Sequence, residues 1–107
     1  MFKLSKGVKK VWWPLMIQVP VDGGKSAQHK IEVQYEVLPQ SEVDAVVNDS
    51  AAFFERTLCD WRMVADDDGN AMECNDENKA AMFDVPYVRS AILTGYFEAA
   101  AGGRRKN

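Results

Sequence analysis

The sequence predicts an α+β fold in which an N-terminal antiparallel β-hairpin packs against a C-terminal bundle of about three helices. Apolar residues alternate with polar ones through the first third of the chain, which is the period of a β-strand. From residue 43 onward they recur mainly at intervals of three and four, which is the period of a helix. With 107 residues, 47% of them hydrophobic and 27% charged, the chain suits one globular domain.

Four parts follow one another within this single domain, which spans residues 1–107. We predict a basic N-terminal arm over 1–10, the hairpin over 11–38, a helical part over 41–101 and a polar tail over 102–107. No apolar run approaches the roughly 18 residues that a membrane-spanning helix needs. The first residues also lack the apolar segment and the cleavage site of a signal peptide, so we expect a cytoplasmic protein without membrane contact.

The hairpin is predicted from two alternating runs, 11–21 and 29–37, that flank a glycine-rich polar turn at 22–28. One pairing that places all apolar side chains on one face joins Val19 to Ile31, Ile17 to Val33 and Leu15 to Tyr35. Pro14 and Pro20 cannot donate to a β-ladder, so the first strand should be an edge strand. Trp12 and Met16 then lie on the opposite face, opposite charged and amide side chains, without an obvious packing partner.

A single helix is expected from Glu42 to about Asp60, with Ser41 as its N-cap. Apolar residues define one side of this helix: Val43, Val46, Val47, Phe54, Leu58 and Trp61. Two further helices follow. Asn75 is expected to cap a short one, and Asp84 with Pro86 to open the last, which has an apolar stripe and ends at the glycines 102–103. That stripe comprises Val88, Ile92, Tyr96 and Ala99.

The acidic stretch 64–75 has some of the features of an EF-hand calcium loop. Aligning Gly69 with the invariant glycine places Asp66 and Asp68 at ligand positions, but Val64 and Asn75 then occupy the two anchoring positions. Valine has no side-chain oxygen and asparagine cannot supply a bidentate carboxylate. We therefore interpret the stretch as a connecting turn, which Asp, Asn and Gly favour, and we expect no metal or other cofactor.

Other chemical motifs are missing as well. His29 has no nucleophile placed beside it by the sequence, and neither a phosphate-binding loop nor a metalloprotease motif occurs. Cys59 and Cys74 are fifteen positions apart, which is not zinc-ligand spacing and leaves a disulfide between them undecided. The net charge of −3 disfavours nucleic acid as a partner, and the basic residues at both ends are interpreted as solvated. We expect no enzymatic activity.

The second half of the chain resembles the tail assembly chaperones of tailed bacteriophages. The resemblance lies in a tryptophan, an Asp-Gly turn, a short helix, a "P-x-V" helix start and a terminal "Y-x-x-A-x-x-G-x-x-x-N" pattern. The matching residues are Trp61, Asp68, Gly69, Pro86, Val88, Tyr96, Ala99, Gly102 and Asn107, with one residue more between Gly102 and Asn107 than the pattern has. The sequence departs from the family where "AMEC" replaces a proline-phenylalanine stretch after the turn. The hairpin and the helix that follows it fit the family's order too.

This resemblance implies a function without catalysis. Such chaperones bind the tape measure protein, a long and largely helical polypeptide, until tail tube subunits polymerise around it. They act in the host cytoplasm and are absent from the mature virion. The family also makes a longer product by a minus-one frameshift, which the final Lys106-Asn107 permits; that extension would bind the tail tube protein.

The candidate partner-binding residues are Trp12, Met16 and Phe53, which could bind the tape measure protein or a second copy in a homo-oligomer, or could instead be core. Two other functions stay open at this point. One is a phage structural subunit such as a head-tail connector. The other is a small calcium-binding or nucleic-acid-binding adaptor that uses the acidic turn or the basic ends.

Overall fold

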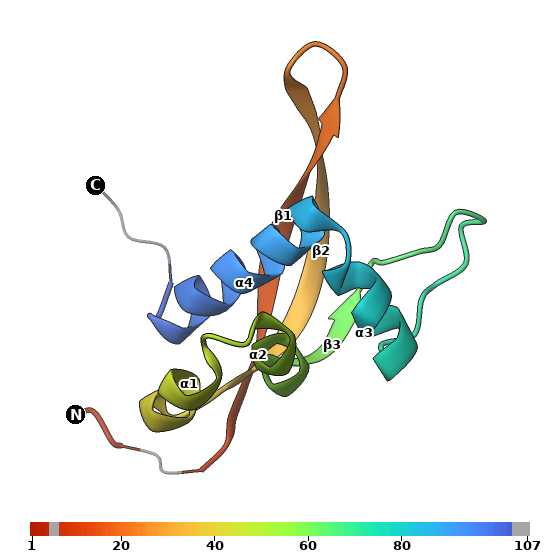
Figure 1. The fold of residues 1–107 in the computed structure, drawn as a ribbon. Coiled ribbons are helices and arrows are strands. Elements are labelled where there is room, and N and C mark those ends of the chain that lie inside the picture. Colours follow the sequence, from red (N-terminus) through yellow and green to blue (C-terminus); the bar gives the residue numbers. More distant parts are fainter. Residues whose placement is uncertain (5–6, 104–107) are drawn as a thin grey trace.

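The computed structural model describes residues 1–4 and 7–103, and it has the predicted α+β class. Its three-stranded antiparallel sheet has the order β1-β2-β3 (Figure 1). The strands are β1 (Lys9–Val21), β2 (Lys25–Val37) and β3 (Leu58–Arg62). The helices are α1 (Gln40–Val46), α2 (Ser50–Thr57), α3 (Asp76–Phe83) and α4 (Pro86–Ala100).

The hairpin is longer and its turn is tighter than predicted. The pairing expected from the sequence was wrong by four residues, because Leu15 lies opposite Ile31 and Ile17 opposite His29. Only Asp22, Gly23 and Gly24 form the turn, and both glycines have positive φ, 87° and 75°, which glycine adopts without strain. An even shift leaves every side chain on its predicted face, so the alternation could not distinguish the two registers.

The predicted helix from 42 to 60 is wrong, because the chain forms two short helices and a strand there. It turns at residues 47–49, where the Asp49 side chain accepts a hydrogen bond from the backbone N–H of Ala52 and caps α2. The first helix begins one residue before the predicted cap Ser41, with Pro39 at its N-cap position. The helical part 41–101 therefore contains the third strand of the sheet.

A β-bulge explains why β3 was mistaken for helix. Leu58 pairs with Tyr35 and Trp61 pairs with Val33, so residues three positions apart on β3 pair with residues only two positions apart on β2. The extra residue lets Leu58 and Trp61 both point to the core, 1% and 6% exposed. A spacing of three is the helical signature in sequence, and here the bulge produces it in a strand.

The last two helices largely follow the prediction. The Asn75 side chain accepts from the backbone N–H of Asn78, as a helix N-cap does. Pro86 starts α4, but its N-cap is Val85 rather than Asp84, which ends α3 instead. At its other end, Gly102 N–H donates to the carbonyl of Ala99 and Gly103 N–H to that of Glu98, the two bonds of a Schellman motif.

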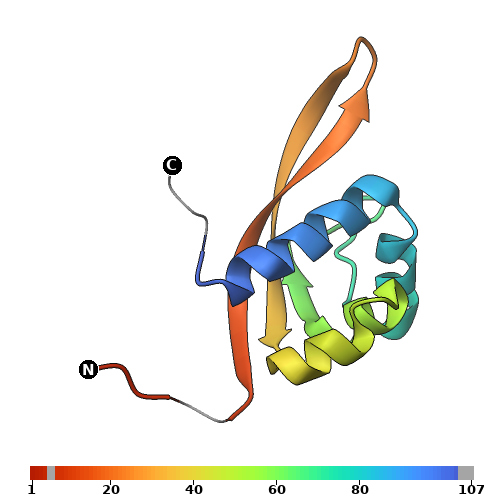
Figure 2. The same ribbon diagram turned by 60° about the vertical axis from the view of Figure 1, so that its left-hand side comes forward.

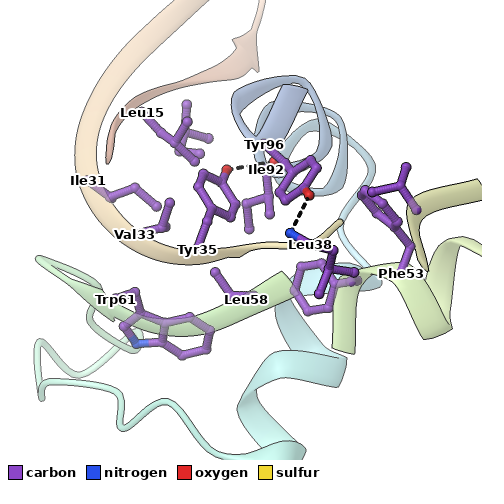
Figure 3. Close-up of a cluster of buried hydrophobic side chains, with 13 residues drawn as sticks. Leu15, Ile31, Val33, Tyr35, Leu38, Phe53, Leu58, Trp61, Ile92 and Tyr96 are labelled. Carbon is purple, nitrogen blue, oxygen red and sulfur yellow. Dashed lines mark hydrogen bonds between the residues drawn. The ribbon is translucent and has the colours of Figure 1, made fainter. Parts of the chain in front are cut away.

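The core lies between one face of the sheet and the helices (Figure 3). Gly95 is the point of closest approach, since a Cβ there would lie 2.2 Å from Leu15 Cδ2 and 2.7 Å from the Tyr35 hydroxyl. The Tyr35 hydroxyl donates to the Ile92 carbonyl at 2.6 Å, and the Tyr96 hydroxyl accepts from the Leu38 N–H at 3.1 Å. The two rings meet edge to face, with centroids 5.6 Å apart.

The hairpin projects beyond this core. Helix α4 crosses β1 and β2 near their middle, and the turn end of the hairpin extends past the helices (Figure 2). The opposite face of the sheet is exposed or half-buried along its whole length. Of the predicted arm 1–10, the described residues 1–4 and 7–10 are exposed, and the last two already belong to β1. The polar tail is described only as far as Gly103.

Gly95→Ala should destabilise the protein although alanine is the better helix former. A methyl group at this position overlaps Leu15 and the Tyr35 hydroxyl, and overpacking of this kind costs about 2 kcal/mol. Thr94→Ala, at the exposed neighbouring position, is the control and should leave the free energy of unfolding within about 0.5 kcal/mol. Urea unfolding of the three proteins measures both values, and equal or higher stability of Gly95→Ala would contradict the close approach.

Candidate functional site

Trp12 and Met16 lie on the face of the sheet that points away from the helices. Trp12 is half-buried, because the Arg62 guanidinium carbon lies 3.7 Å from the centroid of its ring. Arg62 also lies 3.9 Å from the Glu32 carboxylate, so it bridges β3 to the other two strands. Met16 is 45% exposed. Of these two apolar side chains, Met16 is therefore the one more open to a partner.

Phe53, the third candidate from the sequence, belongs to the core. It is 2% exposed and lies edge to face with Tyr96, with centroids 4.9 Å apart. Its other neighbour is Phe97, whose ring stacks on it at a centroid distance of 5.5 Å. Phe97 is 47% exposed, so Phe97 and not Phe53 is the aromatic residue that a partner could contact here.

Helix α4 contributes to three different surfaces. Its core side was predicted correctly, with Ile92 and Tyr96 buried and Val88 and Ala99 half-buried. A second side carries Arg89, Leu93 and Phe97 at intervals of four, and we call it the α4 stripe. A third side faces β1. Only the core side was predicted from the sequence, although Leu93 and Phe97, four positions apart, form a second apolar pair.

Two shallow hollows adjoin the α4 stripe, and they share Phe83, Asp84 and Arg89. One, of about 270 Å³, reaches Leu93, and the other, of about 220 Å³, reaches Phe54 and Ala51 on α2. The Arg89 guanidinium carbon lies 4.2 Å from the centroid of the Phe83 ring, so it covers one aromatic face without closing the hollow. The α4 stripe thus forms one side of an uneven apolar surface between α2, α3 and α4.

A separate groove of about 330 Å³ runs between β1 and α4. Its lining includes Leu15 and Met16 from the strand and Tyr87, Ala91, Thr94 and Glu98 from the helix. We call it the β1–α4 groove. Since β1 is the first strand of the sheet, no strand within the described residues pairs with this edge.

The acidic stretch is a turn stabilised by its own backbone. Asp66 Oδ1 accepts hydrogen bonds from the N–H groups of Asp68 and Asn70, both at 2.9 Å, and Ala65 bridges to Ala71. These bonds engage the Asp66 carboxylate as expected for an Asx turn. Among residues 1–4 and 7–103, no group of three or more acidic, histidine or cysteine side chains is arranged to hold a metal ion.

Trp61, in β3, links this turn to the sheet through a side-chain hydrogen bond. Its Nε1–H donates to the Met72 carbonyl at 2.8 Å. The Met72 N–H in turn donates to the Val64 carbonyl, so the two sides of the loop are joined next to Trp61. The tryptophan and the Asp-Gly turn of the sequence pattern are thus parts of one structural unit.

The two cysteines are free thiols that lie close together, Cys59 in β3 and Cys74 between the acidic turn and α3. Cys74 Sγ donates to the Cys59 carbonyl at 3.7 Å. Burial is the main cause that raises the pKa of Cys74 to about 11, and it raises the pKa of Cys59 as well. Both thiols are therefore protonated at neutral pH and poor nucleophiles.

Charge is distributed unevenly along the chain. Residues 11–103 contain six basic and sixteen acidic side chains, a net charge of −10, whereas residues 1–10 contain four lysines and no acid. None of the described helices is both long enough and apolar enough to cross a bilayer. Comparison with protein-family models, with curated proteins and with solved structures finds no significant match for this chain.

Trp61→Ala should lower the free energy of unfolding by roughly 3–5 kcal/mol, the usual cost of removing a buried tryptophan. Trp61→Phe keeps most of the buried ring and loses the bond to Met72, so about 1 kcal/mol is expected. Denaturant unfolding gives both values, and limited proteolysis should cut both variants faster within 64–72. Parent-like stability of Trp61→Ala would place the ring at the surface.

Alkylation of Cys74 should be slow at neutral pH. With a pKa of about 11, its thiolate is scarce at pH 8, so iodoacetamide should modify it on the order of 100-fold more slowly than in the urea-unfolded chain. The rate should keep rising with pH up to about pH 11, because the thiolate fraction grows over that whole range. Peptide mass spectrometry follows the reaction, and a rate that levels off near pH 9 would contradict the burial effect.

Proposed function

We propose that this protein is a tail assembly chaperone of a tailed bacteriophage, which binds the tape measure protein without catalysing a reaction. The observation that carries the proposal is the exposed Phe97 ring of the α4 stripe, which stacks on the buried ring of Phe53. The sequence pattern supports it, because its described members occupy defined structural positions. Trp61 and Gly69 belong to the fastened turn, Pro86 starts α4, and Gly102 ends it.

The α4 stripe has the character of a binding surface for another helix. Arg89, Leu93 and Phe97 are spaced one turn apart, and Arg89 and Leu93 line a hollow together with Phe83. A helical partner presents apolar residues at the same spacing, and an amphipathic helix commonly lays its apolar side into such a groove. Exposed Phe97, held against Phe53 by stacking, supplies a rigid aromatic anchor.

A tape measure protein is a suitable partner for such a surface, because it is long and largely helical. Its apolar side chains would be exposed until the tube closes around it, and a chaperone must cover them reversibly. A half-exposed surface without deep pockets suits a partner that is later released to the tube. We further propose that the protein acts in the host cytoplasm and leaves before the virion is complete.

The longer frameshifted product would link this surface to the tail tube protein. Helix α4 ends at Ala100 in its Schellman motif, so the elements that make up the core are complete by Gly103. An extension added beyond this point would leave the core and the α4 stripe unchanged. Expression of the N-terminally tagged gene with its downstream sequence tests this step: a second, larger tagged product is expected, and the short product alone would refute it.

Phe97→Ser should abolish or strongly weaken capture of the tape measure protein. Removing an exposed aromatic anchor typically costs a binding interface about 2 kcal/mol, or roughly 30-fold in affinity. Tyr87→Ser is the matched control, because Tyr87 is also an exposed aromatic residue of α4 but lines the β1–α4 groove instead. Both variants should keep the thermal stability of the parent to within a few degrees.

The assay is co-expression with the large coiled-coil-like reading frame expected immediately downstream, followed by affinity purification and measurement of the soluble fraction of that product. Loss of capture in Phe97→Ser with retention in Tyr87→Ser supports the α4 stripe. Failure of the parent to bind or solubilise the downstream product would overturn the chaperone proposal. Presence of the protein in purified virions, measured by mass spectrometry, would favour a structural subunit instead.

A further inference from the structure

The outer edge of β1 has backbone groups available to another strand. Pro14 and Pro20 both lie at even positions, and proline is tolerated in a strand where an N–H would point away from the ladder. The backbone groups of the other even residues therefore point outward too, including those of Trp12, Met16 and Gln18. The two prolines keep their outward carbonyls, so a partner strand could still donate to them.

Helix α4 turns this edge into a groove with defined chemistry. The β1–α4 groove is lined by Leu15 and Met16 of β1 and by Tyr87, Ala91 and Thr94 of α4. Glu98, also of α4, is its one acidic residue. An extended segment paired with β1 would fill it, alternating its side chains between the helix side and the outer face of the sheet. The groove thus suits an extended strand that carries small or apolar residues and a cation.

Residues 1–10 have this chemistry. Apolar side chains stand at even positions, Phe2, Leu4 and Val8, and the lysines include Lys3, Lys9 and Lys10. Met1, Phe2, Leu4 and Val8 are each at least 73% exposed, so the described arm has little cover in a single copy. Its positive charge complements the net charge of −10 on residues 11–103.

The arm of the same copy does not reach the groove. In a hairpin, antiparallel partners lie equally far from the turn, so residues 1–4 folded back onto β1 would align with residues up to about Trp12. Leu15 and Met16 would stay uncovered. The arm of a second copy is not restricted in this way, because it arrives from the opposite direction.

We propose that two copies of this protein form a symmetric dimer through their β1 edges, with residues 8–10 of each copy lying beside the β1–α4 groove of the other. Antiparallel pairing about Trp12 places Val8 beside the partner's Met16, and Lys10 beside the partner's Pro14. The Lys10 N–H can then donate to the carbonyl that the proline retains. Lys9 lies beside the partner's Leu15, on the side of the groove where Glu98 is found.

This arrangement explains the unusual outer face of β1. Both Trp12 rings meet at the two-fold axis, each already backed by its own Arg62, and the sheets join into one of six strands. Trp12 and Met16 then contact the second copy, while the α4 stripe stays free. The dimer thus uses a different surface from the one proposed to bind the tape measure protein.

Sedimentation equilibrium of the full chain tests the dimer. The parent should sediment as a dimer at micromolar concentrations. The variant Lys9→Glu with Lys10→Glu should raise the dissociation constant about tenfold or more, because it lowers the net side-chain charge of residues 1–10 from +4 to 0 and so removes their attraction to the acidic body. Lys25→Glu, an equally exposed strand residue at the hairpin turn, is the control and should dimerise like the parent. A parent that stays monomeric up to about 100 μM would overturn the proposal, because its dissociation constant would then lie far above the micromolar range.

Disulfide trapping tests the register. Val8→Cys mixed with Met16→Cys should give a covalent dimer on mild oxidation, while Val8→Cys mixed with Val21→Cys should not. The parent under the same oxidation controls for Cys59 and Cys74. A dimer that forms without this cross-link, or that cross-links equally well through Val21, would refute the exchange of arms. Neither result bears on capture of the tape measure protein, which the α4 stripe variant reports separately.

Discussion

The contact between Gly95 and the sheet determines how the rest of this protein is arranged. With only a hydrogen at its Cα, Gly95 lets the backbone of α4 approach until Leu15 and the Tyr35 hydroxyl fill the space of a missing methyl group. That approach brings the Ile92 carbonyl within 2.6 Å of the Tyr35 hydroxyl, which donates to it inside the core. Burial, with a smaller contribution from Glu98, raises the pKa of Tyr35, so the hydroxyl keeps its proton and remains a donor.

The position of α4 then decides which surfaces stay open. The helix lies across the middle of β1 and β2, so it covers neither the turn end of the hairpin nor the outer face of the sheet. Its own side chains divide among the core, the β1–α4 groove and the α4 stripe. One close contact therefore creates two separate apolar surfaces, one beside a strand edge and one between helices. A protein that binds one partner of its own kind and one of another kind can use such a separation.

Short elements complete the fold around this contact. The chain turns at residues 47–49, and a bulge in β3 lets Leu58 and Trp61 point the same way. Trp61 in turn holds the acidic loop through the Met72 carbonyl. The two cysteines are partly buried, which raises the pKa of each thiol and keeps both protonated at neutral pH. The acidic residues that suggest a metal site in the sequence belong instead to this loop. Asp66 accepts hydrogen bonds from the loop's own backbone, and the neighbouring acidic side chains are exposed.

The sequence by itself determined the α+β class, the face assigned to each residue of the hairpin, the cap at Asn75 and both ends of α4. These features depend on local periodicity, on side chains that bond to neighbouring backbone groups, and on the backbone freedom of proline and glycine. Only the tertiary structure decided the register of the hairpin, because shifting it by four residues preserves the alternation. It also decided that Leu58 to Arg62 is a strand, since a bulge reproduces a helical spacing, and that Phe53 is buried while Phe97 is exposed, because both rings suit either place until α2 and α4 are packed together.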